Sequence, residues 1–228
     1  MQERPTASTD IKVRKLPQVR STAQVLIAVG ILELIYGQWT AAPGQVKLEF
    51  MWLAVGLALY FGSTRVIAVI RWIALFAVVP AVVMPVQQVL LAPLELTAVQ
   101  LRLYPIQVLS FFVPLLLTAA VTLFAAWRLN SASVKSALRI HGMSPAGPVV
   151  PAVLGLLAIG GGTALLHHTL NGPDAVQAAE MAASRFGTKY KYFTNRLHVV
   201  SNKGTTVYAN VQMWNDREAL QVPVQWSR

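Results

Sequence analysis

The stretch VIAVIRWIALFAVVPAVVMPV, residues 66–86, decides the class of fold, because Arg71 is its only charged residue. A helix needs about 20 predominantly apolar residues to cross the hydrocarbon core of a bilayer. Within that core every backbone N–H and C=O must be satisfied inside the protein, which a helix achieves. We therefore expect a membrane-embedded all-α bundle of about five transmembrane helices within residues 22–170. Four further stretches come near the required length, at about 22–40, 48–64, 106–128 and 149–170.

The composition of the whole chain agrees with a membrane protein. Of its 228 residues, 55% are hydrophobic and 12% are charged, whereas soluble domains carry about 25% charged residues. The chain has no cysteine, which excludes disulfide bonds, thiolate metal sites and cysteine nucleophiles. Its 19 basic and 9 acidic residues give a formal charge of +10, and the positions of these cations decide what the charge means.

The cations predict the orientation of the chain, because lysine and arginine in short loops stay on the cytoplasmic side of a membrane. If the basic segment 1–21 is cytoplasmic, five crossings leave only Lys47 and Arg102 on the far side before the C-terminal tail. We therefore expect a multi-pass protein of the bacterial inner membrane with a cytoplasmic N-terminus and a periplasmic C-terminus, and no nucleic-acid partner. The cytoplasmic set comprises Arg4, Lys12, Arg14, Lys15, Arg20, Arg65, Arg71, Arg128, Lys135 and Arg139.

Two connections between the spans differ in character. Residues 87–103 mix glutamine, proline and charged residues with leucine and valine, and polar residues are too frequent there for a lipid-facing helix. We expect an interfacial helix, with a re-entrant loop as the alternative. Residues 130–148 contain serine, glycine and proline and predict a polar loop outside the bilayer.

The tail, residues 171–228, predicts a small extracytoplasmic α+β domain. Val176, Ala179, Ala183 and Phe186 mark one face of a helix that Gly187 ends. Apolar and polar residues then alternate, as in half-buried strands, with apolar residues at 207, 209, 211 and 213 and again at 220, 222, 224 and 226. Residues 189–193 and 196–201 predict one or two earlier strands, and residues 215–218 a hairpin turn. We expect one helix on an antiparallel meander of three or four strands.

Two polar residues lie inside predicted spans. Glu33 is about two-thirds of the way through the first span, where an unpaired carboxylate costs several kcal/mol. It predicts either a proton or cation site or a carboxyl group buried against another helix or a partner. Because Glu33 interrupts the apolar run and the leader is long and polar, we expect the first span to be retained and not cleaved as a signal peptide. Arg71 can reach toward Glu33 or extend to the inner headgroups.

Glycine marks the fifth span. Gly155, Gly160, Gly161 and Gly162 give this helix small side-chain positions that permit close helix packing. The alternative use of such a run is a hinge or unwound segment in a transport pathway. We expect the packing role.

The sequence contains no catalytic or nucleotide-binding motif, so we expect neither an enzyme nor a bound cofactor. His167 and His168 are weak metal candidates, because adjacent histidines on one helix point about 100° apart and metal sites need several convergent ligands. Surface residues of the tail are candidates for docking a partner, with Pro223 marking an edge strand. These candidates are Tyr190, Tyr192, Val222, Pro223, Val224 and Trp226.

Together these features predict a non-enzymatic accessory, assembly or scaffold subunit of a larger bacterial inner-membrane complex. Its partners would be other integral membrane subunits and the lipid bilayer, with self-association left open. Docking would use the helices and the periplasmic C-terminal domain. The alternative is a small transporter or channel that uses Glu33 and the proline-bent helices, in which Pro80, Pro85 and Pro114 each remove a backbone hydrogen bond.

Overall fold

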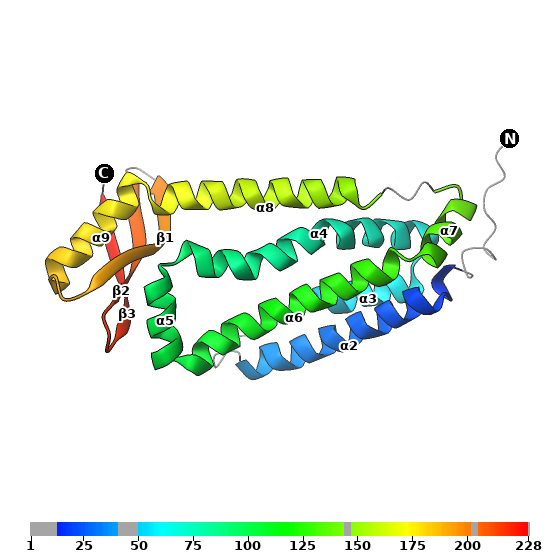
Figure 1. The fold of residues 1–228 in the computed structure, drawn as a ribbon, viewed down its shortest axis with the longest axis horizontal. Helices are drawn as coiled ribbons and strands as arrows, with labels where there is room; N and C mark the ends of the chain where they lie inside the picture. The colour runs from blue at the N-terminus through cyan, green and yellow to red at the C-terminus, as the bar shows by residue number, and fades with distance from the viewer. Residues whose placement is uncertain (1–12, 41–49, 144–146, 202–204, 228) are drawn as a thin grey trace. The chain divides into compact units, whose positions relative to one another are not determined.

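The computed structural model describes residues 13–40, 50–143, 147–201 and 205–227 (Figure 1). The chain forms two compact units. The first, here called the helical unit, comprises Met1–Ala81 and Leu117–Leu156. The second, called the mixed unit, comprises Val82–Leu116 and Leu157–Arg228 and contains the sheet.

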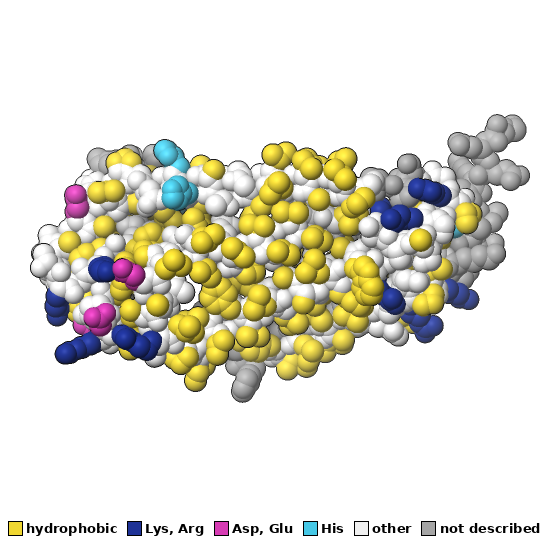
Figure 2. Space-filling model, in the orientation of Figure 1, with side chains coloured by type: hydrophobic (Ala, Val, Ile, Leu, Met, Phe, Trp, Pro, Cys, Tyr) yellow, Lys and Arg dark blue, Asp and Glu magenta, His cyan; other side chains and the backbone are white. Residues whose placement is uncertain are grey.

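Four described helices are long and apolar enough to cross a membrane. Most of their large hydrophobic side chains are exposed on the protein surface (Figure 2), as expected for helices solvated by lipid. These features indicate a multi-pass membrane protein. The helices are α2 (Pro17–Thr40), α4 (Thr64–Leu91), α6 (Pro105–Leu129) and α8 (Val149–Leu170).

The structure differs from the sequence prediction at 48–64, where a full-length span was expected. The structure has an 11-residue helix there, α3 (Met51–Phe61), which ends at the extended backbone of Gly62. Eleven residues rise about 16 Å, roughly half of the hydrocarbon thickness. The described part of the chain therefore has four full-length spans where the sequence predicted five, and residues 41–49 before α3 lie outside the described ranges.

Glycines let α2 and α3 approach closely within the helical unit. A Cβ added at Gly30 would lie 2.3 Å from the Leu53 backbone nitrogen, and one added at Gly56 would lie 2.8 Å from the Ile27 nitrogen. Because the earlier residue of α2 contacts the later residue of α3, the two helices run antiparallel. Small residues at such contacts maximise van der Waals packing between membrane helices.

The predicted loop at 130–148 contains a helix, α7 (Ala132–Ile140). Val134 and Leu138 lie four residues apart on one face, and both are fully buried in the apolar core of the helical unit. Gly142 follows with φ +70°, a left-handed conformation that favours glycine at a helix end. Two apolar residues on one face thus bury a segment that overall polarity suggested was a loop.

The mixed unit contains two short helices and the sheet. The predicted interfacial segment 87–103 is divided at Pro93, with α4 continuing to Leu91 and a separate helix, α5 (Leu94–Leu103), after it. Helix α9 (Pro173–Phe186) leads into three antiparallel strands in the order β1-β2-β3. The strands are β1 (Lys191–Ser201), β2 (Thr205–Trp214) and β3 (Ala219–Ser227).

One face of the sheet packs on α9. The predicted alternation on β2 is confirmed, because Val207, Ala209, Val211 and Met213 are all buried. The predicted face of α9 is wrong by about one residue. Its buried positions are Ala175, Ala178 and Ala182, whereas Val176 and Phe186 are exposed. Alanines bring the helix axis close to the sheet, and the larger side chains flank that contact.

Of the one or two early strands predicted at 189–193 and 196–201, the structure has one, β1, interrupted by a bulge. Thr194 pairs with Val211 and Arg196 pairs with Asn210, so that Asn195 has no partner in the ladder. The Thr194 hydroxyl is buried and donates to the Ala175 carbonyl at 2.7 Å. The bulge shifts the alternation by one residue, as such irregularities do.

The predicted hairpin joins β2 to β3. The Asn215 side-chain oxygen accepts hydrogen bonds from the backbone N–H groups of Arg217 at 2.8 Å and Glu218 at 3.0 Å. This arrangement is typical of asparagine at a turn.

Candidate functional site

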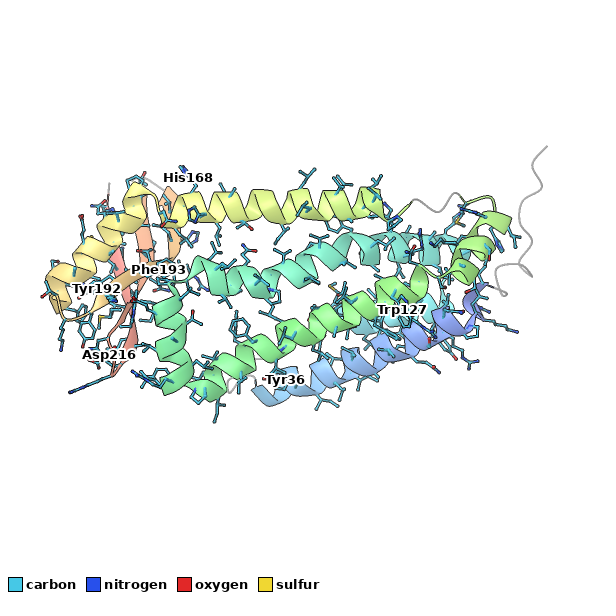
Figure 3. All side chains as sticks on the ribbon, viewed as in Figure 1. Tyr36, Trp127, His168, Tyr192, Phe193 and Asp216 are labelled. Atoms are coloured by element: carbon cyan, nitrogen blue, oxygen red, sulfur yellow. The ribbon has the colours of Figure 1, made fainter. Side chains whose placement is uncertain are left out.

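The face of the sheet opposite α9 is polar. Phe193, Gln212 and Gln221 are paired across the three strands and form one row. Their neighbours along the strands, including Val211 and Val222, pack with α9. Because successive side chains of a strand point to opposite faces, this row lies on the face away from α9. Figure 3 labels Phe193 on β1.

Helix α5 is attached to the sheet at both ends and in the middle. Glu95 forms an ion pair with Lys191, and Arg102 donates to the backbone oxygen of Asp216 in the hairpin. Between them, the Gln100 amide donates to Gln212 at 3.3 Å. The two ion-pair side chains are 63% and 64% exposed, so that pair contributes about 0–1 kcal/mol. It fixes the position of α5 more than it stabilises the fold.

A cavity of about 750 Å³ lies within the mixed unit. Its volume is within the range of small-molecule sites. It is lined by α5, the sheet and the adjoining ends of α4, α6 and α8, and both the sheet side chains and the helix ends include apolar and amide residues. Much of its polar lining consists of primary amides. These are Gln88, Gln100, Gln107, Asn195, Gln212 and Gln221.

The bulge on β1 shapes the charged part of this cavity. Among the described residues that line it, Arg196 is the only one with a charged side chain. Asn195 lies at the unpaired position of the bulge. Its side-chain oxygen is buried without a hydrogen-bond partner in the described structure. Bulges of this kind often re-aim side chains beside binding sites.

Glu33 and Arg71 lie on separate helices of the helical unit. Glu33 is partly buried in α2. Arg71 is only 2% exposed, and its guanidinium donates to the Asn130 side-chain oxygen at 2.8 Å. The guanidinium is thus held among the helices, at the junction with the end of α6, and does not extend to the surface.

The four glycines of α8 have two different environments. A Cβ added at Gly155 would lie 2.4 Å from the Phe76 carbonyl oxygen, so this position contacts α4 within the helical unit. At Gly160, Gly161 and Gly162, an added Cβ would meet no described atom within 4 Å. Consecutive helix residues point about 100° apart, so the glycine run leaves a broad arc of α8, centred on Gly161, uncovered and without side chains.

The histidine candidates are at the C-terminal end of α8. The His167 ring lies 3.2 Å from the Asn171 amide nitrogen, and His168 is exposed. The described residues contain no group of three or more potential metal ligands.

Most of the predicted docking residues have contacts inside the mixed unit. Tyr192, Val222, Val224 and Trp226 pack with α9. The Tyr192 hydroxyl donates to the Gly187 carbonyl at 2.5 Å. Desolvation, followed by the effect of nearby Tyr190, raises the pKa of Tyr192.

The other two docking candidates lie elsewhere on the sheet. The Tyr190 hydroxyl donates to Glu218 at 2.5 Å. Pro223 pairs with Asn210 on the edge strand β3 and is exposed.

The cavity was not among the sequence predictions. Its signals are present as separate observations, namely the polar residues of 87–103 and the glutamines at the polar positions of two strands. Nothing in the one-dimensional pattern connects Gln100 with Gln212, which are 112 residues apart. The chain matches no protein-family model, no curated protein and no solved structure.

Proposed function

We propose that the chain is a non-enzymatic accessory, assembly or scaffold subunit of a larger bacterial inner-membrane complex. Its helices dock other integral membrane subunits, and its C-terminal domain provides a second contact in the periplasm. The observation that carries this proposal is the uncovered glycine run of α8, Gly160–Gly162. Glycine costs helix stability relative to alanine, and a membrane helix recovers that cost when another backbone packs closely on it.

The burial pattern of α8 supports the proposal that this helix binds another chain. Its buried residues are Pro151 and Gly155, both in its first two turns. By contrast, Leu157 and Leu165 are 65% and 68% exposed. Only two residues separate the end of α8 from the start of α9. A partner that packs on α8 would therefore also position the C-terminal domain.

The cations of the helical unit support the proposed orientation. Arg128 donates to the Ser21 hydroxyl at 2.9 Å, which joins the C-terminal end of α6 to the start of α2. The Arg20 guanidinium lies 6.0 Å from the centre of the Tyr60 ring, near the end of α3. These contacts gather basic residues at one end of the helical unit, as the positive-inside rule expects for a cytoplasmic end.

Co-purification tests this proposal. The full chain with an N-terminal affinity tag would be extracted in a mild detergent, and the mass of the protein component would be measured by light scattering. We expect a complex that contains at least one different chain. Gly161→Leu should release that chain, because the side chain occupies the space needed for close packing. Leu156→Phe, at a position 56% exposed, is the matched control and should retain it.

Three results would contradict the proposal. The wild-type chain could be a monomer, it could form only copies of itself, or Gly161→Leu could retain the partner as well as the control does.

A further inference from the structure

The cavity of the mixed unit combines apolar and amide side chains. Phe111 and Phe112 on α6 and Leu166 and Leu170 on α8 give it an apolar lining at the ends of membrane-spanning helices. Amides come from α5 and the sheet and also from those helices, at Gln88 and Gln107. A ligand that satisfies both kinds of lining is amphiphilic, with an apolar part continuous with the hydrocarbon region and a polar head.

The charge of the cavity restricts that head. Arg196 supplies a positive charge, and no aspartate or glutamate is among the described residues that line the site. Arginine recognises phosphate and carboxylate through several N–H donors at once. The amide groups of Gln100, Gln107 and Gln212 add further N–H donors for an anion. An anionic or neutral head is therefore favoured over a cationic one.

Asn195 adds one more requirement. Its side-chain oxygen is buried, accepts no hydrogen bond from the described residues and lies on the residue next to Arg196. An unsatisfied buried acceptor costs about 1–3 kcal/mol. A ligand that carries a hydroxyl group near its phosphate would satisfy both residues.

We infer that this cavity binds a glycerophospholipid, with its phosphodiester at Arg196 and the glutamine amides, a head-group hydroxyl at Asn195, and the start of its acyl chains against α6 and α8. The volume of about 750 Å³ holds the head group and the first part of the chains. An extended peptide would use the amides of the lining, but it explains neither the cation nor the apolar side chains contributed by two spans. This inference does not depend on the docking of a partner subunit.

The test uses the purified full chain in a neutral detergent, with added palmitoyl-oleoyl phosphatidylglycerol followed by native mass spectrometry. We expect saturable binding of one lipid per chain, and weaker binding of the matching phosphatidylcholine, whose head has no hydroxyl. Arg196→Gln should reduce the affinity about 10-fold, because a charge-assisted hydrogen bond is lost. Arg217→Gln removes an exposed hairpin cation that does not line the cavity and should leave the affinity unchanged.

A second pair of variants tests the cavity without removing a charge. Val108 lines the cavity, whereas its neighbour Leu109 is 55% exposed and does not. Val108→Trp should fill the site and abolish the one-to-one lipid adduct, and Leu109→Trp should preserve it. Circular dichroism of each variant checks that the chain is folded.

Several outcomes would overturn the inference. Equal lipid retention by the wild type and by all four variants would indicate only non-specific surrounding lipid. Displacement of the lipid by millimolar inorganic phosphate would assign the site to the free anion. A co-purifying polypeptide that is lost with Arg196→Gln, in the absence of any lipid adduct, would assign it to a peptide.

Discussion

The glycines of α2 and α3 and those of α8 show two uses of the same residue. Gly30 and Gly56 are pressed against the backbone of a neighbouring helix, with an added Cβ as close as 2.3 Å to another atom. Gly160, Gly161 and Gly162 meet nothing within 4 Å among the described atoms. Between membrane helices there is little hydrophobic driving force, because lipid is as apolar as leucine, so close packing of small residues matters more. The first pair completes its contact within the chain, and we attribute the second set to a contact with another chain.

The largest expected effect is at the covered glycines. Gly30→Leu places a side chain into the Leu53 backbone, which cannot move aside as a flexible side chain would. Overpacking of this kind costs about 3 kcal/mol or more. Denaturant titration of the detergent-solubilised chain should show a clear loss of helical stability. Gly161→Leu should stay within about 0.5 kcal/mol of the wild type when both chains have been separated from any bound partner, and an equal loss in both variants would remove the distinction.

The sheet offers a second contrast, between its α9-facing side and its polar side. Val211 is fully buried against α9, and Val211→Ala should destabilise the mixed unit by about 2 kcal/mol through a cavity. Gln225 is exposed on the polar side, and Gln225→Ala should have an effect near zero. Hydrogen–deuterium exchange of the β2 amides measures the change in stability of each variant. Similar protection in the two variants would mean that α9 does not stabilise the sheet as described.

A smaller effect is expected at the buried cation. Asn130→Ala removes one acceptor of the Arg71 guanidinium, at an expected cost of about 1.5 kcal/mol. Asn130→Asp keeps an acceptor oxygen and should restore most of the stability. Thermal unfolding in detergent compares the two, and equal destabilisation by both substitutions would show that the hydrogen bond is not the stabilising feature.

The smallest effect is expected where α5 meets the sheet. Lys191→Ala removes one member of an exposed ion pair, which should change the free energy of unfolding by less than about 1 kcal/mol. Added salt should reduce this small loss further, because it screens the charges of an exposed ion pair. A salt-dependent loss of several kcal/mol would mean that the ion pair holds the mixed unit together.

The apolar spans and the alternating strands of this fold were predictable from the sequence. The hydrocarbon core requires a minimum length of apolar helix, and a half-buried strand alternates apolar and polar residues. The span at 149–170 coincides with α8, and the buried positions of β2 follow from simple alternation. Whether each residue contacts lipid, water or the protein core determines its polarity, so the local pattern of polarity is sufficient to predict these elements.

Features that depend on local breaks or on distant contacts were not predictable in the same way. The length of α3 depends on where Gly62 leaves the helix, and the continuity of β1 depends on a single unpaired residue, Asn195. The cavity requires α5 and β2 to come together, although Gln100 and Gln212 lie far apart in the chain. The buried face of α9 consists of alanines that allow the helix to approach the sheet closely. Larger apolar residues at other positions of the helix suggested a different face.

The most direct test of the central claim is photo-crosslinking from α8 in intact membranes. The chain has no cysteine, so Leu165→Cys, one turn after Gly161 and 68% exposed, and Leu156→Cys each provide one attachment point for a benzophenone maleimide without filling a glycine position. The two positions are about 180° apart around the helix. We predict that the probe at 165 crosslinks to a specific chain of different mass, whereas the probe at 156 labels mainly lipid. Equal crosslinking to lipid from both positions, with no protein adduct at 165, would contradict the proposal that the glycine run binds a partner subunit.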